Sequence, residues 1–95
     1  ATLLNVASGS LVDEPALVAA LRSGQLSGAA LDVTSEEPLP AASPLWDAPN
    51  LFLTPHTSAV STRLWERQTE ILLDNLVRFR AGAPLRHLVD KRRGY

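Results

Sequence analysis

The sequence predicts an α/β fold in which a small parallel sheet is flanked by helices. Three short apolar runs, at residues 2–7, 27–33 and 51–54, alternate with segments that carry helix or turn signals. A helical pattern separates the first two runs, and strand, helix and strand within about 30 residues form a βαβ unit with parallel strands. The second run ends in acidic residues, and open α/β sheets build active sites at the carboxyl ends of their strands. We therefore expect a sheet of about three strands with a functional edge.

The segment between the first two runs has the signals of a short helix. Asp13 is a capping acid, Glu14 adds a charge that favours the amino end of a helix, and Pro15 is tolerated in the first turn. Leu17 and Leu21 fall on one face of the predicted helix. Ser23-Gly24 follows, and glycine suits the left-handed conformation that ends many helices. These residues predict a crossover helix.

The two remaining predicted strands differ from each other in what surrounds them. The apolar residues of 27–33 are continuous rather than alternating, which is typical of a parallel strand that is covered on both faces. Residues 38–49 contain four prolines, so they exclude a long helix but permit one capped turn at 43–47. Residues 51–54 form a third strand that Pro55 ends.

The longest predicted element is an amphipathic helix over residues 61–81. Trp65, Leu72, Leu76 and Phe79 lie on one side of it, and most charged residues lie on the other. Gly82 and Pro84 end it. We expect the apolar side to lie in a core or at a domain interface, and residues 83–95 to form a tail.

Composition limits the possible partners and locations. The formal net charge is −1, so no overall field favours nucleic acid. No apolar run reaches the length of a membrane span, and no leader-like segment opens the chain, so we expect a cytoplasmic protein. The sequence has no methionine and opens on an apolar run. We expect it to be the carboxyl-terminal part of a longer polypeptide; a processed mature chain is the alternative.

The predicted strand ends bring a histidine and a carboxylate together. Parallel neighbouring strands end side by side, so His56, after the third strand, can meet Glu37, after the second. A carboxylate raises the pKa of a neighbouring histidine and orients its ring. Such a histidine can serve as general acid or base in carbonyl–alcohol interconversion. The alternatives are a simple surface histidine at position 56 and solvated acids at positions 32 and 37.

Five motifs in register resemble one family. They are Asn5-Val6-Ala7, Leu11-Val12-Asp13-Glu14, Gly28-Ala29-Ala30-Leu31-Asp32-Val33, Glu37-Pro38-Leu39 and Thr54-Pro55-His56. Together they resemble the carboxyl-terminal portion of the NAD(P)-dependent D-isomer-specific 2-hydroxyacid dehydrogenases, in particular the glyoxylate/hydroxypyruvate reductases. The resemblance implies a Rossmann-type sheet fragment. It also implies that residues 1–59 belong to an NAD(P)-binding domain, 60–82 to a connecting helix, and 83–95 to a tail that returns to the substrate domain.

The resemblance also implies a reaction and its residues. His56 would be the acid/base and Glu37 its partner, and hydride would pass between NAD or NADP and a small 2-oxo or D-2-hydroxy acid. The cofactor-binding positions would be Ala7, Ser8, Asp32, His56 and Ser58. No metal is implied. The expected assembly is a cytoplasmic homodimer that binds neither nucleic acid nor membrane.

The sequence departs from the resembling family in two ways. Ser8 stands where the family has an arginine that binds the substrate carboxylate. The glycines, at 9, 24, 28, 82 and 94, form no GxGxxG phosphate loop. We therefore expect this chain to be inactive alone. The alternatives are a non-catalytic NAD-binding or interaction module, and a fragment that folds by exchanging elements with a second copy.

Overall fold

The computed structural model describes residues 1–94. The chain forms two compact units, residues 1–59 and residues from 60 onward. The first unit contains the sheet and a crossover helix, and the second contains the long helix.

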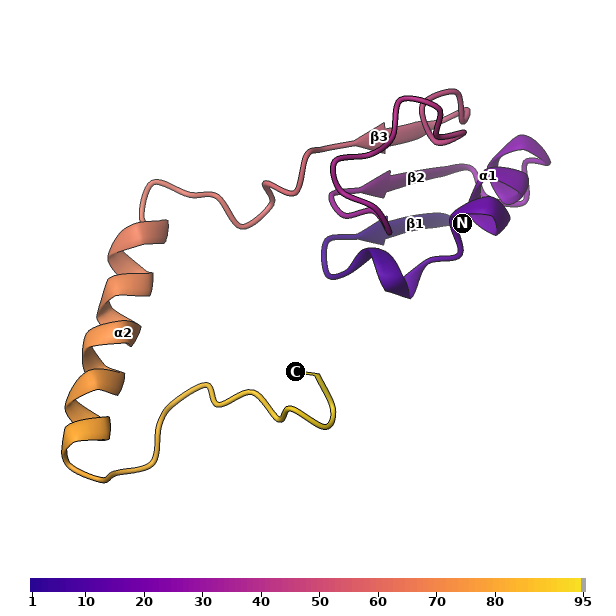
Figure 1. Cartoon of the computed structure of the whole chain (residues 1–95). Helices are drawn as coiled ribbons and strands as arrows, with labels where there is room; N and C mark the ends of the chain where they lie inside the picture. Colours follow the sequence, from indigo (N-terminus) through magenta and orange to yellow (C-terminus); the bar gives the residue numbers. More distant parts are fainter. Residues whose placement is uncertain (95) are drawn as a thin grey trace. The chain divides into compact units, whose positions relative to one another are not determined.

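The first unit is built on three parallel strands: β1 (Thr2–Asn5), β2 (Gly28–Leu31) and β3 (Leu51–Leu53), in the order β1-β2-β3 (Figure 1). Helix α1 (Glu14–Arg22) lies between β1 and β2 in the chain. The predicted α/β class with a parallel three-stranded sheet is confirmed. β1 ends earlier than predicted because the Asn5 side chain turns the chain: it accepts a hydrogen bond from the Ala7 amide (3.1 Å) and donates one to the Ser8 carbonyl (2.7 Å).

Helix α1 has the caps that its sequence predicts. The Asp13 carboxylate accepts a hydrogen bond from the Ala16 amide at 3.0 Å. Pro15 lies in the first turn, and Gly24 follows the helix with φ of 75°. A short 3-10 helix, Gly9–Leu11, precedes α1 and was not predicted.

The core of this unit lies on one face of the sheet. Leu31 of β2 and Leu45 of the following loop are each 1% exposed, and they pack with Leu17 and Leu21 of α1. On the opposite face, Leu4 and Phe52 are 75% and 67% exposed. The expectation that β2 is covered on both faces is therefore wrong for this chain, because the described part of residues 1–59 packs α1 and the 38–48 loop on the same face.

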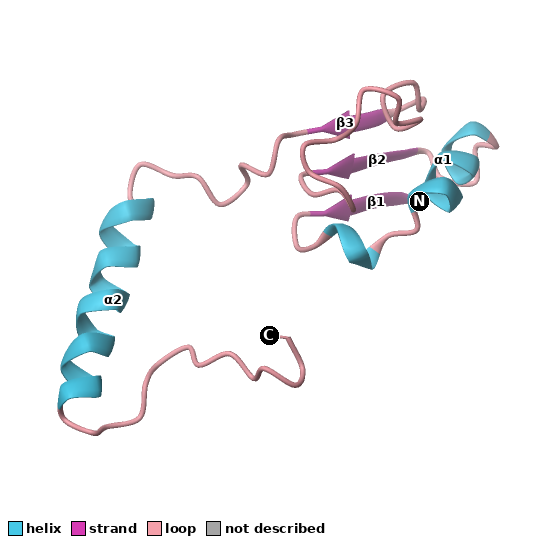
Figure 2. Cartoon of the chain, in the orientation of Figure 1, coloured by secondary structure: helices cyan, strands magenta, loops and turns pink. Residues whose placement is uncertain are grey.

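The second unit is dominated by α2 (Leu64–Arg80), which is followed by a tail without regular structure through residue 94 (Figure 2). The helix begins later than the predicted residue 61. Asp74 and Arg78, which are one turn apart on its surface, form an ion pair with an Oδ2–Nε distance of 2.9 Å. Trp65 and Phe79 remain 77% and 75% exposed. Within residues 1–94, neither helix has the length and apolarity needed to cross a membrane.

Candidate active site

Backbone hydrogen bonds tie the carboxyl ends of the three strands together. The Asp32 amide donates to the Asn5 carbonyl (3.0 Å), which joins the end of β2 to the end of β1. The His56 amide donates to the Asp32 carbonyl (2.8 Å), which joins the end of β3 to the end of β2. The loops that follow the strands therefore meet at one edge of the sheet.

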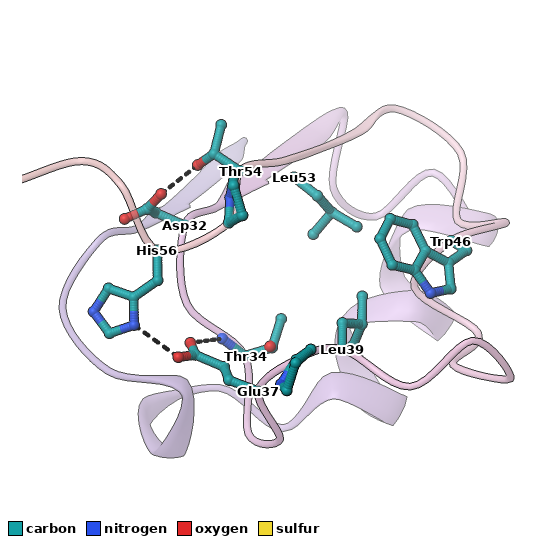
Figure 3. Close-up of a pocket in the computed structure, with 10 residues that line it drawn as sticks. Asp32, Thr34, Glu37, Leu39, Trp46, Leu53, Thr54 and His56 are labelled. Atoms are coloured by element: carbon teal, nitrogen blue, oxygen red, sulfur yellow. Dashed lines mark hydrogen bonds and ion pairs between the residues drawn. The ribbon is translucent and has the colours of Figure 1, made fainter. Parts of the chain in front are cut away.

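Glu37 and His56 form a hydrogen-bonded pair at this edge, which becomes an ion pair when the imidazole is protonated. His56 Nδ1 lies 2.7 Å from Glu37 Oε2 although the residues are 19 positions apart in sequence (Figure 3). Because an ionised carboxylate can only accept, Nδ1 carries the hydrogen and Nε2 is the ring nitrogen left for other partners. The imidazole is 60% exposed. The arrangement leaves an oriented histidine that can exchange a proton with a bound molecule.

The pairing shifts both pKa values in the directions expected for an ion pair. The hydrogen bond from His56 lowers the pKa of Glu37, and the Thr34 amide, which donates to Glu37 Oε1 at 3.1 Å, lowers it further. The hydrogen bond to Glu37 and its negative charge raise the pKa of His56. The imidazolium form therefore persists to higher pH than in an isolated histidine.

Asp32 is only 4% exposed, and its carboxylate organises the loop that carries His56. Oδ1 accepts hydrogen bonds from the Thr54 hydroxyl (2.5 Å) and the Thr57 amide (2.9 Å), and Oδ2 accepts one from the Ser58 amide (2.9 Å). These bonds, led by that of Thr54, hold the pKa of Asp32 far below its ordinary range. His56 itself has a positive φ of 54°, a conformation that its surroundings must enforce.

The loop after β1 satisfies its polar groups internally. Asn5 bridges the Ala7 amide and the Ser8 carbonyl, and the Ser8 hydroxyl lies 2.9 Å from the Ser10 hydroxyl.

Arg22 is the single arginine or lysine in residues 1–59. It occupies the last turn of α1, at the opposite end of the strands from this edge, because a crossover helix runs antiparallel to its strands. The Glu37–His56 edge therefore has no cation from residues 1–59 other than His56.

A cleft of about 710 Å³ opens beside the Glu37–His56 pair (Figure 3). Half of the residues that line it are polar or charged and half are apolar. The polar or charged ones are Asp32, Thr34, Glu37, Thr54 and His56; the apolar ones are Pro38, Leu39, Trp46, Leu53 and Pro55. The Trp46 indole is fixed by donating to the Pro40 carbonyl at 2.9 Å. Within the described residues, no group of three metal-binding side chains occurs.

The structure thus brings Glu37, His56, Asp32 and the Ser58 amide to one edge, as the sequence analysis expected, while Ala7 and Ser8 lie in the adjoining loop. Their expected roles in catalysis and cofactor binding stay predictions. Sequence reasoning missed Thr34 and Thr54, which hold Glu37 and Asp32. Their contacts depend on loop geometry, so no spacing signal pointed to them.

The first unit matches a known protein family. Residues 1–58 match the family model described as "D-isomer specific 2-hydroxyacid dehydrogenase, NAD binding domain". Among curated relatives, glyoxylate/hydroxypyruvate reductase A of Klebsiella pneumoniae is 50% identical over 93 residues, which are 98% of this chain and 29% of the relative. The same-named protein of Salmonella newport is 46% identical over 95 residues, 100% of this chain and 30% of the relative. The chain therefore spans about 30% of the length of these relatives.

Solved structures show the same likeness. A D-isomer specific 2-hydroxyacid dehydrogenase from Xanthobacter autotrophicus, in complex with NADPH and MES, is 45% identical with a TM-score of 0.88; the match covers 100% of this chain and 38% of that one. An NADPH-dependent glyoxylate/hydroxypyruvate reductase from Sinorhizobium meliloti, in complex with NADP and sulfate, is 38% identical with a TM-score of 0.87. That match covers 99% of this chain and 29% of that structure.

Proposed function

We propose, from the premise that this chain belongs to the D-isomer specific 2-hydroxyacid dehydrogenase family, that it is the carboxyl-terminal part of an NAD(P)-dependent oxidoreductase. The reaction interconverts a small 2-oxo acid, of the glyoxylate or hydroxypyruvate class, and the corresponding D-2-hydroxy acid. The observation that carries this proposal is the Glu37–His56 pair, which presents an exposed, oriented imidazole at the carboxyl edge of a parallel sheet.

The residues at this edge can carry out the proton transfer of a carbonyl reduction, but not the hydride transfer. His56 Nε2, protonated, gives its proton to the carbonyl oxygen and returns to neutral imidazole, while Glu37 keeps Nδ1 protonated and the ring in place. The side chains of the described site contain no hydride donor, so the site requires a redox cofactor. A nicotinamide cofactor bound there would supply the hydride for the carbonyl carbon. Asp32, Ala7, Ser8, His56 and Ser58 are the positions that we assign to its nicotinamide side.

The domain organisation follows from the same proposal. Residues 1–59 are the end of the NAD(P)-binding domain, residues 60–82 connect it to the substrate domain, and residues 83–95 return to that domain. The expected whole protein is a cytoplasmic homodimer. The exposed apolar residues of α2, including Trp65 and Phe79, support a role at an interface. Sedimentation of the whole protein measures the assembly, and a strictly monomeric species would contradict it.

The first test of the activity replaces the proposed acid. In the whole protein that contains this sequence, His56→Ala should lower kcat for NADPH-dependent glyoxylate reduction by about 10²- to 10⁴-fold, the range for a lost general acid. NADPH affinity should fall far less than kcat, because His56 is one of several positions that we assign to the cofactor. His87→Ala is the matched control, because His87 is the other histidine of the sequence and is not among the residues that line the cleft. Unchanged turnover in His56→Ala would remove the basis of the proposed reaction.

The serine at position 8 favours a second candidate, a non-catalytic NAD-binding or interaction module. An anionic substrate at this edge would meet the Glu37 carboxylate and no cation of residues 1–59 except His56. The test is Ser8→Arg in the whole protein, assayed for glyoxylate reduction. A rise by orders of magnitude from negligible activity would favour the non-catalytic module. Full activity of the Ser8 protein would show that another part of the molecule binds the carboxylate.

A further inference from the structure

The position of Glu37 beside His56 depends on the conformation of the loop after β2. A residue of helix α1, Glu14, binds that loop. The Glu14 carboxylate accepts a hydrogen bond from the Ser35 amide at 2.6 Å. Glu14 is half-buried in the first turn of α1, and it is 21 residues away from Ser35 in sequence. A bond of this length between an amide and an ionised carboxylate is of the strong, charge-assisted kind.

The anchored amide lies directly beside the amide that positions Glu37. Ser35 follows Thr34, whose N–H donates to Glu37 Oε1 at 3.1 Å. Consecutive amides of one loop are thus held by two carboxylates, Glu14 on one and Glu37 on the other. The Thr34–Ser35 peptide is joined to the Thr34 amide through the Thr34 Cα, so a shift of the Ser35 amide displaces the residue whose N–H makes one of the two bonds to the Glu37 carboxylate.

A third contact leaves this peptide little freedom on its other side. Gly9 is buried against the backbone of Thr34 and Ser35, with no room there for a Cβ atom. Glu14 is itself held in place because α1 packs into the core through Leu17 and Leu21. A continuous path therefore runs from the core through α1 and Glu14 to the 34–35 peptide, Glu37 and the His56 ring.

From this path we propose that Glu14 is a positioning residue for the Glu37–His56 pair. The inference rests on the proposed function only for its kinetic consequence; the effect on the His56 ring can be measured whether or not the protein turns over a 2-oxo acid. Neither Glu14 nor its hydrogen-bond partner Ser35 lines the cleft, so the proposed effect of Glu14 on the pair passes through the loop.

A competing explanation assigns Glu14 to the helix alone, since an acid in the first turn stabilises an α-helix through its dipole. Two conservative variants separate the explanations. Glu14→Gln keeps the length and an oxygen that can accept the Ser35 N–H but loses the charge. Glu14→Asp keeps the charge at the start of α1 but is one methylene too short to reach Ser35. Positioning predicts that Gln replaces Glu14 better than Asp does, whereas a helix-dipole role predicts the reverse order.

The experiment compares Glu14→Gln, Glu14→Asp and Glu14→Ala in the whole protein, with Glu36→Ala as control. Glu36 lies in the same loop. Its side chain is exposed and forms no hydrogen bond with any residue that the structure describes. The readouts are the pH titration of the His56 ring by NMR and kcat for glyoxylate reduction with NADPH.

We expect Glu14→Asp and Glu14→Ala to move the His56 titration toward lower pH and to lower kcat roughly tenfold to a hundredfold. Glu36→Ala should stay near the unmodified protein in both, and Glu14→Gln, which keeps the acceptor but not its charge, should lie between the unmodified protein and Glu14→Asp. An unchanged His56 titration in Glu14→Asp overturns the proposal, whatever happens to thermal stability, and so does a greater effect of Gln than of Asp. If the unmodified protein reduces no 2-oxo acid, the proposed function fails, while the NMR titration still decides the role of Glu14.

Discussion

The replacement Gly9→Ala should impair the Glu37–His56 pair through a contact made far from it in sequence. Gly9 does not adopt a positive φ, so its backbone accepts alanine without strain. The added Cβ atom would lie 2.6 Å from the Ser35 nitrogen and still nearer to the carbonyl carbon and oxygen of Thr34. An ordinary contact begins at 3.4 Å, so residue 9 and the Thr34–Ser35 peptide must separate by about 0.8 Å at the Ser35 nitrogen and by more at the Thr34 carbonyl.

This displacement sets the expected size of the effect. The Thr34 amide, on the other side of the Thr34 Cα from the displaced carbonyl, donates to Glu37 Oε1 at 3.1 Å, and a displacement of Thr34 approaching 1 Å away from Glu37 takes that bond beyond hydrogen-bonding distance. A misplacement of about 1 Å in a catalytic constellation can cost on the order of 10²-fold in rate. We expect kcat for glyoxylate reduction by the whole protein to fall by about that factor. Overpacking should also lower the free energy of unfolding by ~1–3 kcal/mol.

Gly24→Ala is the matched control for lost stability. Gly24 has φ of 75° and open space around it, so alanine there is strained but touches nothing. It should lower the free energy of unfolding by about 1–2 kcal/mol and leave kcat unchanged. Steady-state kinetics and urea unfolding of both variants are the assays. A Gly9→Ala protein with unaltered kcat, measured where it is fully folded, would refute the reasoning.

Three further predictions follow from the same geometry. Glu37→Gln removes the charge that raises the pKa of His56, so the imidazolium is lost at lower pH; the falling limb of the kcat/KM profile for reduction should move toward lower pH, and an unmoved limb would count against the pairing. Asp32→Asn replaces one carboxylate oxygen by an NH₂ group that cannot accept, so it should speed amide hydrogen exchange at Thr57 or Ser58 relative to that of α1; equal exchange would show that Asp32 does not hold the loop. Leu31→Ala, at a side chain only 1% exposed, should lower the free energy of unfolding by about 2–5 kcal/mol in urea titrations, and a loss under 1 kcal/mol would place Leu31 outside the core.

Local signals in the sequence determined most of the backbone of the first unit. Helix α1 begins at the Asp13 cap and Pro15 and ends before Gly24, and each of these residues acts within a few residues of its own position. Short apolar runs separated by a helix allow essentially one arrangement, a right-handed parallel crossover, so the sheet followed from pattern alone. The meeting of Glu37 and His56 was predictable for the same reason, because parallel strands place their carboxyl ends side by side.

The tertiary structure alone decided what holds that pair in place. The bond from Ser35 to Glu14 and the contact of Gly9 with Thr34 join residues more than 20 positions apart through loop geometry, which no periodicity encodes. In the sequence, Glu14 is indistinguishable from an ordinary first-turn acid, and Asp32 from a solvated strand-end acid. Whether each of these carboxylates faces water or a backbone amide depends on how α1 and the loops pack against the sheet. Packing sums many weak contacts over the whole unit, so it is settled only when the chain folds.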